Sequence, residues 1–282
     1  MMKVAVIGLG LIGGSMAKAV HENAGLEVYG TDADPKTVKM ALDEGTLTKK
    51  LEFDNASDCD LFIVALYPKD VVGVIKEYAG HMKPGAIVVD CTGVKSQVCN
   101  ELSQFLSAKG IHFVGGHPMA GKESSGIENA SSDIFKGANY IVTPTEKNTE
   151  EAILLCKEIG RLFGFGRITL ETPEEHDRLI GFLSQLAHCI AISLMTCCDT
   201  SGMASSSGDS FRDLTRIAKI NDEMWSELFL LNRDVLTEQM DLFSDAFQKL
   251  RNYIESGDRE AIRKIMKLST KQRKLFDKVK EN

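Results

Sequence analysis

One stretch near the N-terminus decides the fold class of this chain: Lys3-Val4-Ala5-Val6-Ile7-Gly8-Leu9-Gly10-Leu11-Ile12-Gly13-Gly14-Ser15. A short apolar run, typical of a buried strand, breaks into G-x-G-x-x-G and continues as a helical pattern. In such a turn Gly8 permits the tight bend, Gly10 lets the backbone approach a pyrophosphate, and Gly13 allows close packing of helix on strand. The helix that follows directs its N–H groups toward the phosphates, and Leu11 and Ile12 are also expected to contact the cofactor. The stretch predicts dinucleotide binding.

A second strand pattern, residues 26–30, ends at Thr31-Asp32. Asp32 lies about 20 residues beyond the glycines, where an acidic side chain binds the ribose in dinucleotide folds. Three glycines at this spacing also occur in ordinary loops, but here strand, glycines, helix and acid agree. Asp32 and Asp34 would repel a 2′-phosphate, and no arginine sits beside them. The pattern therefore predicts NAD rather than NADP as the cofactor.

Composition and charge limit the classes of partner. The chain has 282 residues, 43% hydrophobic and 26% charged, with a formal net charge of −7. The negative charge argues against nucleic acid or an anionic membrane as the main partner, because both require a basic surface. Met1-Met2-Lys3 leads into the first strand without a signal-peptide pattern, and apolar runs such as residues 61–66 are too short to span a bilayer. We expect a cytoplasmic protein without a membrane partner.

The cysteines form an odd set of seven: Cys59, Cys91, Cys99, Cys156, Cys189, Cys197 and Cys198. They include no C-x-x-C pair, and no histidine accompanies them at zinc-site spacing. We expect reduced, mostly buried thiols and no metal site.

The chain is long enough for two domains. Residues 1–171 alternate short β-branched runs with helical patterns, which predicts a Rossmann-type α/β domain with a doubly wound parallel sheet. Thr172-Pro173-Glu174-Glu175 marks the boundary, because it supplies an N-cap, a proline at the first helical position and a capping-box glutamate. Residues 172–282 show no strand pattern and are expected to form an all-helical domain. Its first helix, residues 174–198, is apolar on most sides and is expected to be largely buried.

His117 is the histidine best placed for chemistry. It follows the expected strand 112–116, at the edge of the sheet where open α/β folds bind ligands. Its flanking glycines permit close approach of a substrate, and Pro118 fixes the backbone direction. A hydride-transfer reaction needs a group that takes the alcohol proton, which a histidine can do. The residues alone leave a catalytic and a structural role equally open.

Two polar pairs in the helical half also allow two interpretations. Ser184 and His188 are four residues apart and share one helix face, which favours a satisfied core hydrogen bond over a polar pocket. Asp213 precedes Arg216 by three residues and could hold its guanidinium for a carboxylate ligand. From spacing alone, a surface ion pair is the simpler interpretation of the second pair.

Taken together, the motifs resemble the prephenate dehydrogenase family of tyrosine biosynthesis, including its arogenate-oxidising members. The matching stretches are residues 6–15, Asp90-Cys91-Thr92-Gly93-Val94-Lys95, residues 115–126, Glu175-His176-Asp177 with Ser184 and His188, and residues 211–218 followed by Met224-Trp225. The histidine and arginine motifs are specific in combination, whereas the nucleotide motif is not. The resemblance covers nearly the whole chain and implies NAD-dependent oxidative decarboxylation of prephenate to 4-hydroxyphenylpyruvate, or of arogenate to tyrosine.

The resemblance also implies roles for single residues. His117 matches the catalytic histidine that accepts the proton of the ring hydroxyl. Arg216 matches the arginine that binds a substrate carboxylate, with Asp213 orienting it. Many members carry a serine where this chain has Gly93, so Thr92 is the candidate for that catalytic contact. Positions lining the substrate pocket or its entrance are matched by Ser184, His188, Trp225 and Glu123.

Two alternatives are disfavoured by particular residues. β-Hydroxyacid dehydrogenases place a catalytic lysine on the long helix of the second domain, but no lysine occurs between Lys157 and Lys219. A regulatory, NAD-sensing protein would not need His117, Asp213 and Arg216 together.

The apolar residues at 225–231 and 240–253 exceed what one small helical domain readily buries. The family resemblance also implies dimers. We therefore expect a homodimer formed through the second domain, with a small molecule as the only other partner.

Overall fold

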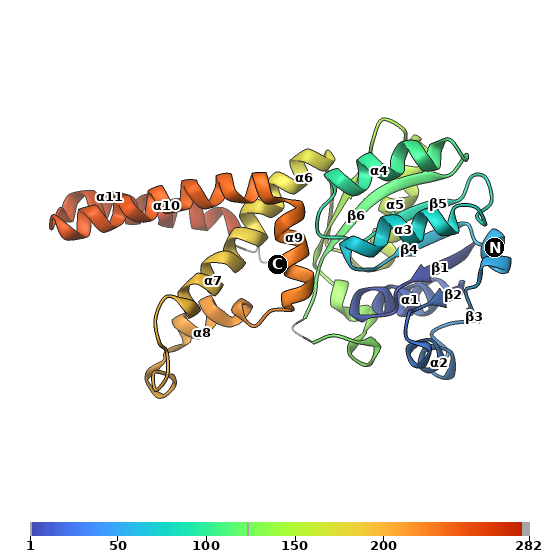
Figure 1. Cartoon of the computed structure of the whole chain (residues 1–282), viewed down its shortest axis with the longest axis horizontal. Coiled ribbons are helices and arrows are strands. Elements are labelled where there is room, and N and C mark those ends of the chain that lie inside the picture. The colour runs from blue at the N-terminus through green and yellow to red at the C-terminus, as the bar shows by residue number, and fades with distance from the viewer. Residues whose placement is uncertain (1, 123, 278–282) are drawn as a thin grey trace, which may run out of the picture. The chain divides into compact units, whose positions relative to one another are not determined.

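A computed structural model describes residues 2–122 and 124–277, and within these eight strands form one sheet (Figure 1). The strand order is β3-β2-β1-β4-β5-β6-β7-β8. The strands are β1 (Lys3–Ile7), β2 (Glu27–Thr31), β3 (Lys49–Lys50), β4 (Leu61–Val64), β5 (Ile87–Asp90), β6 (His112–Met119), β7 (Asn139–Thr143) and β8 (Arg167–Leu170). The reversal of strand order at β1 places the first β–α turn at a switch point, where open α/β sheets bind ligands.

Helices cover both faces of this sheet, as the alternation of patterns predicts. They are α1 (Leu11–Ala24), α2 (Pro35–Asp43), α3 (Pro68–Tyr78), α4 (Ser96–Ser107) and α5 (Glu150–Leu162). Successive strand residues face opposite sides of a sheet. Accordingly Val4 and Val6 join the apolar cluster that includes α1 and α5, whereas Ala5 and Ile7 join the cluster that includes α3 and α4. The doubly wound fold class is confirmed.

The sheet is not parallel throughout, because β7 runs antiparallel to β6. The pairing of β5 with β6 ends at Asp90 and Gly115, and β6 then continues against β7 as far as Met119. His117 therefore lies inside a strand, opposite Ile141, and the expectation that it follows the strand is wrong. The pattern Gly-Gly-His-Pro lacks the β-branched residues that signal a strand, and pairing with β7 supplies the missing preference.

The helical half begins where the sequence predicts. The Thr172 hydroxyl accepts a hydrogen bond from the Glu175 backbone, and the Glu175 carboxylate accepts one from the Thr172 backbone. The helix is nevertheless not one regular element. A π-helical segment, Gly181–Leu186, separates α6 (Pro173–Ile180) from α7 (Ala187–Thr196), and α8 (Asp209–Thr215) and α9 (Asp222–Leu231) follow.

The expectation that this first helix is largely buried is wrong within the described chain. Ala191 is the single buried residue of α7, and the side chains of Phe182 and Leu183 are about half exposed. Among the described residues, Pro173–Thr196 is the one stretch whose length and composition would allow it to cross a membrane, a criterion that core helices of soluble proteins also meet. Apolar periodicity indicates which side chains avoid water, but it does not identify the segment that covers them.

The chain divides into two compact units, Met1–Arg233 and Asp234–Asn282. The second unit contains α11 (Arg259–Arg273) and all but the first residue of α10 (Arg233–Glu255). A turn with Gly257 at φ +66° joins these helices, and the Asp258 carboxylate caps α11 by accepting a hydrogen bond from Ala261. The functional boundary at residues 171 and 172 stays a prediction.

Candidate active site

The three motif glycines have three different environments. Gly8 has φ +87°, and a Cβ there would lie 2.4 Å from the Ala65 carbonyl oxygen. A Cβ at Gly13 would lie 1.9 Å from the Gly8 carbonyl oxygen, so helix and strand are in direct contact. At Gly10, by contrast, none of the described atoms would lie within 4 Å of an added Cβ. The turn therefore leaves open space where a phosphate would approach the backbone.

Asp32 is bound to the same turn. Its Oδ2 accepts a hydrogen bond of 2.7 Å from the Leu9 N–H, and its Oδ1 accepts one of 2.9 Å from the Asp34 N–H. A carboxylate has about four acceptor positions, so Asp32 retains capacity for ribose hydroxyls. Leu11 and Ile12 form the first turn of α1, and among the described residues no side chain caps that terminus. These residues fit a bound dinucleotide.

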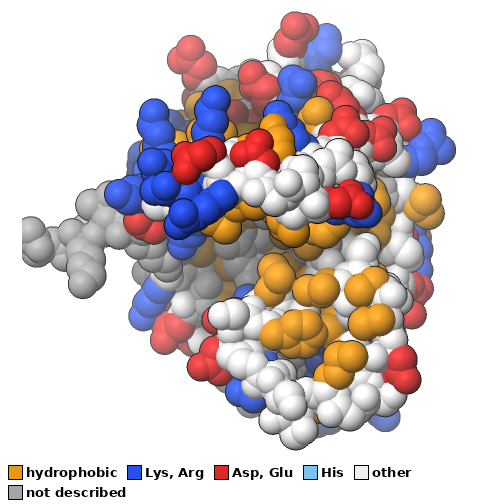
Figure 2. Space-filling model, turned by 90° about the vertical axis from the view of Figure 1, so that its left-hand side faces the viewer, with side chains coloured by type: hydrophobic (Ala, Val, Ile, Leu, Met, Phe, Trp, Pro, Cys, Tyr) orange, Lys and Arg blue, Asp and Glu red, His pale blue; other side chains and the backbone are white. Residues whose placement is uncertain are grey.

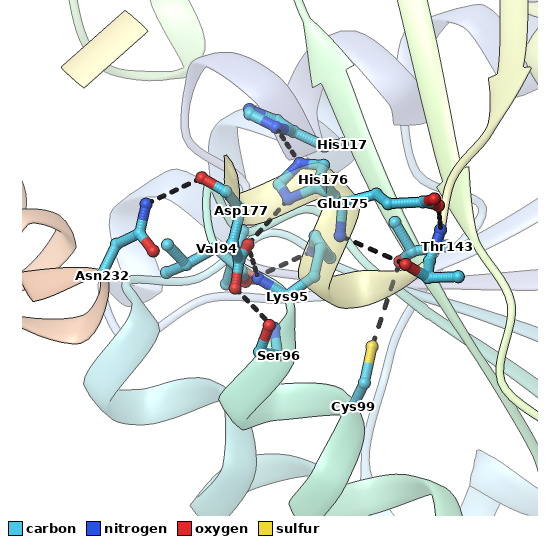
Figure 3. Close-up of polar contacts among 12 residues, drawn as sticks. Val94, Lys95, Ser96, Cys99, His117, Thr143, Glu175, His176, Asp177 and Asn232 are labelled. Carbon is cyan, nitrogen blue, oxygen red and sulfur yellow. Dashed lines mark hydrogen bonds and ion pairs between the residues drawn. The ribbon is translucent and has the colours of Figure 1, made fainter. Parts of the chain in front are cut away.

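His117 projects from β6 into a chain of hydrogen bonds (Figure 3). Its Nδ1 lies 2.8 Å from Nε2 of His176, which stands on α6 and is fully buried. Nδ1 of His176 in turn lies 2.8 Å from Oδ1 of Asp177. Burial, together with the nearby His176 and Lys95, lowers the pKa of His117 well below its usual value. The His117 ring is therefore neutral at neutral pH, as a proton acceptor must be.

Asp177 is held at the N-terminus of α4. Its Oδ1 accepts a hydrogen bond of 2.7 Å from the Lys95 N–H, and its Oδ2 accepts one of 2.8 Å from the Ser96 N–H. Asn232, just after α9, donates to the Asp177 carbonyl oxygen at 2.9 Å. Burial opposes ionisation, but hydrogen bonds from His176 and Ser96 hold the pKa of Asp177 below its usual value. A charged carboxylate is thus fixed between the sheet domain and the helices that follow it.

A second buried cluster, formed by Asp90, Thr92 and Lys95, adjoins this series of hydrogen bonds. Lys95 and Asp90 are both fully buried, with 2.5 Å between Nζ and Oδ2. The Thr92 hydroxyl contacts Asp90, lies 2.9 Å from the Val94 carbonyl oxygen and accepts a hydrogen bond of 3.0 Å from Lys95. Thr92 is therefore engaged in a structural network, and its role as a catalytic contact stays a prediction.

Gly93 lies between His117 and Leu228. A Cβ at Gly93 would lie 3.9 Å from Cε1 of His117 and 3.2 Å from Cδ2 of Leu228 on α9. The Leu228 side chain thus restricts the space that a larger residue at position 93 would need.

His188 lies in a second group of predicted site residues. Its ring packs against that of Trp225 with 3.7 Å between centroids and a tilt of 32°, and its Nδ1 donates to the Ser184 carbonyl oxygen at 2.9 Å. Ser184 thus contributes its backbone rather than its hydroxyl to this contact. Burial is the main cause that lowers the pKa of His188, and the positive charge of Arg216 adds to the effect. The structure therefore places Arg216 near enough to His188 for its charge to affect the pKa of that ring.

The remaining predicted residues are exposed or undescribed. Asp213 and Arg216 are both exposed and stand one turn apart, at the end of α8 and at its junction with the next turn. Arg212, on the same helix, lies 3.3 Å from the Asp209 carboxylate. Glu123 lies outside the described residues, so its predicted place at the pocket entrance stays a prediction.

Helix α9 links the two groups of residues. Trp225 packs against His188, and Leu228, three residues later, faces Gly93 beside His117. Residues three apart share one face of a helix. One face of α9 therefore borders both the proton-accepting and the cationic group.

His176 and Asp177 lie in one of the sequence motifs that match the family, but no role was predicted for them, and neither Leu228 nor Asn232 was predicted as a site residue. The His-Asp pair that follows the capping box of Thr172 and Glu175 was the one signal in the sequence for the first two. Apart from the contact between His176 and Asp177 themselves, the partners of these four residues come from distant segments, which periodicity does not indicate.

The described residues contain no group of three histidine, cysteine, aspartate or glutamate side chains that could hold a metal ion. Desolvation raises the pKa of the buried thiols of Cys59, Cys99 and Cys156 to about 12. A thiol with so high a pKa is a poor nucleophile at neutral pH. These three thiols are therefore not candidates for the chemistry of the site.

Comparison with known proteins places this geometry in a family. Residues 16–165 match the family model described as prephenate dehydrogenase, nucleotide-binding domain, and residues 172–268 match prephenate dehydrogenase, dimerization domain. A prephenate dehydrogenase from Bacillus subtilis is 30% identical over 274 residues, covering 94% of this chain and 73% of that protein. A cyclohexadienyl dehydrogenase from Zymomonas mobilis is 30% identical over 287 residues, covering 96% and 94%.

A crystal structure of prephenate dehydrogenase from A. aeolicus, in complex with hydroxyphenyl propionate and NAD+, has the same fold. It matches with a TM-score of 0.88 and 27% identity, covering 98% of this chain and 99% of that one. Because two family models together span most of the sequence and relatives match along nearly all of it, this chain belongs to the prephenate dehydrogenase family.

Proposed function

We propose that the protein is an NAD-dependent prephenate dehydrogenase, which converts prephenate to 4-hydroxyphenylpyruvate and carbon dioxide. The observation that carries this proposal is the position of His117, a neutral histidine held from behind by a buried hydrogen-bond chain. The names of the relatives and the ligands of the A. aeolicus structure support the same substrate class and cofactor. We propose a cytoplasmic location for the protein, which is consistent with a family of biosynthetic enzymes.

The glycine turn and Asp32 would hold the cofactor. NAD, when bound, supplies the acceptor for the hydride that leaves the carbinol carbon of the ring. Gly10 leaves room for the pyrophosphate, and the free acceptor positions of Asp32 suit the ribose hydroxyls.

His117 would act on the ring hydroxyl. As the hydride departs, the His117 ring accepts the hydroxyl proton and the oxygen forms a carbonyl. The bond between the ring and its carboxylate then breaks, carbon dioxide leaves, and the electron pair restores aromaticity. The phenolate oxygen takes the proton back from His117, so protons balance and the histidine returns to its neutral form.

Arg216 would bind a carboxylate of the substrate. Prephenate carries two carboxylates, and the protein as a whole carries a net charge of −7, so a local cation is needed. Arg216 is exposed, and its charge lowers the pKa of His188, which packs against Trp225. The aromatic pair and the cation together suit a ring that bears an anionic group.

We also propose a homodimer assembled through the helical half. The family match over residues 172–268 is described as a dimerization domain. Figure 2 shows hydrophobic side chains gathered in the lower half of the view. Exposed apolar residues in the helical half include Phe182, Leu183, Leu214, Leu230, Leu242 and Phe247. Light scattering should give twice the mass of one chain, and a monomeric mass that does not change with concentration would refute this arrangement.

The activity can be tested by following reduced nicotinamide absorbance with prephenate and then with arogenate. We expect NADH formation with prephenate, accompanied by one carbon dioxide per turnover. Faster turnover of arogenate would reassign the preferred substrate within the family. Failure with both, by enzyme that still binds NAD, would contradict the proposed function.

A further inference from the structure

We propose that His176 and Asp177 are positioning residues that keep the proton of His117 on Nδ1 and leave its Nε2 bare toward the substrate. This inference rests on the proposed function, because it assigns the nitrogen through which His117 accepts the hydroxyl proton. It concerns residues that do not touch the reacting atoms.

Asp177, at one end of this series of hydrogen bonds, fixes the direction of each bond in it. The ionised carboxylate of Asp177 can only accept, so Nδ1 of His176, at 2.8 Å, must donate. In a neutral ring the other nitrogen is then an acceptor. Nε2 of His176 lies 2.8 Å from Nδ1 of His117, and the proton between them must therefore belong to His117. Nε2 of His117 is left with its lone pair available.

Asp177 anchors this series of hydrogen bonds and is itself held in place by backbone N–H donors. Both oxygens of Asp177 accept N–H groups, from Lys95 and Ser96, where α4 begins. A helix N-terminus stabilises negative charge, so the carboxylate has a reason to stay ionised and in place. Asn232 donates to the Asp177 backbone and also to the Gln185 side chain at 2.7 Å, which ties the anchor to the π-helical segment.

Protonation of His176 would reverse the arrangement. Both ring nitrogens would then donate, Nδ1 of His117 would have to accept, and its Nε2 would carry the proton that blocks catalysis. The charged groups near this ring are the Asp177 and Asp90 carboxylates and the Lys95 ammonium, with His117 on its far side. Burial is the main cause that lowers the pKa of His176, with the charge of Lys95 acting in the same direction and Asp177 opposing it. The productive arrangement is therefore the neutral one.

Two substitutions at position 176 separate this role from simple packing. His176→Gln keeps an oxygen that can accept from Nδ1 of His117, whereas His176→Leu removes the acceptor. We expect His176→Leu to lower kcat by about 10²-fold with KM for prephenate changed little, and His176→Gln to restore most of that loss. His112→Gln, at the start of the same strand, is the matched control and should retain wild-type kcat.

Equal loss of kcat in both variants, or full activity of His176→Leu, would overturn the proposal. If His176→Leu does not fold, Asp177→Asn provides the test. The asparagine amide must direct its NH₂ group toward a donor at Lys95, Ser96 or His176, so we expect about a 10- to 100-fold loss of kcat. Wild-type kcat in a folded Asp177→Asn enzyme would refute the positioning role.

Nitrogen chemical shifts of the histidine rings supply a readout that does not depend on activity. We expect His117 and His176 both to carry the proton on Nδ1 in the wild-type enzyme, and His117 to lose that preference in His176→Leu. An Nε2-protonated His117 in the wild type would overturn the inference. An enzyme inactive with both substrates yet showing Nδ1 protonation would instead refute the proposed function and leave the positioning intact.

Discussion

The residues around His117 and those around Arg216 differ in their exposure to solvent. His117 is backed by buried His176 and by Asp177, whose carboxylate and carbonyl oxygens have defined donors. Arg216 and Asp213 lie on the surface of short helical turns. The difference matches the proposed chemistry, because proton transfer requires a fixed geometry whereas capture of a charged substrate requires access from solvent.

We expect the largest effect from removing the imidazole of His117, which is half-buried on β6. His117→Ala should lower kcat by about 10²–10⁴-fold, with a smaller change in KM, because the proton transfer occurs in the transition state. Steady-state kinetics with prephenate would measure this effect. NAD affinity, measured by protein fluorescence or calorimetry, should stay near the wild-type value. Wild-type turnover by this variant would overturn the assignment of the proton acceptor.

Removal of the exposed group should act on binding instead. Arg216→Ala should raise KM for prephenate by about 10- to 100-fold, since a charge-assisted contact with a carboxylate is worth about 1.5–3 kcal/mol and exists in the ground state as well. Arg212→Ala is the matched control, because Arg212 lies one turn earlier and pairs with Asp209. An unchanged KM in Arg216→Ala, or an equal rise in both variants, would contradict the assignment.

The glycine turn repeats the contrast between packed and open positions. Gly13→Ala should lower the free energy of unfolding by about 1–3 kcal/mol, because its Cβ would overlap the Gly8 carbonyl oxygen. Gly10→Ala should leave the unfolding midpoint nearly unchanged, since the space there is open, yet weaken NAD binding. Thermal unfolding and NAD titration of both variants would test this. Equal destabilisation by the two substitutions would contradict the geometry.

The choice between NAD and NADP tests the role of Asp32. The ratio of kcat/KM for NAD over NADP should be at least about tenfold, equivalent to ~1.4 kcal/mol. Asp32→Asn should reduce the ratio, since it removes the charge that repels a 2′-phosphate while an oxygen can still accept from Leu9. Equal use of NAD and NADP by the wild-type enzyme would refute the role of Asp32.

The smallest expected effect is the change of kcat with pH near neutrality. The pKa values of His117 and His176 both lie below the usual histidine value, mainly through burial. The productive neutral forms are thus fully populated above that value and are lost only as pH falls through the lowered pKa values. Between pH 6.5 and 8, kcat should therefore change by less than about twofold. A loss centred at or above pH 6.5 that His176→Gln does not alter would contradict this account.

Local patterns in the sequence determined much of this protein. The alternation of patterns predicted a doubly wound sheet, and Thr172 and Glu175 predicted where the helical half begins. The glycine spacing predicted the turn whose packed and open positions the structure contains. These features depend on residues close together in the chain, so propensity, capping and backbone sterics suffice to predict them.

Other features were decided only by tertiary structure. Strand β6 extends through His117 because β7 pairs with it, and the hydrogen bond between His117 and His176 joins residues 59 positions apart. The apolar side chains of the first helix of the helical half looked like a buried core in the sequence, yet many are exposed in the single chain. Hydrogen-bond partners and covering surfaces come from distant segments or other molecules. A local pattern can indicate that such partners are needed, but only the folded arrangement determines which residues supply them.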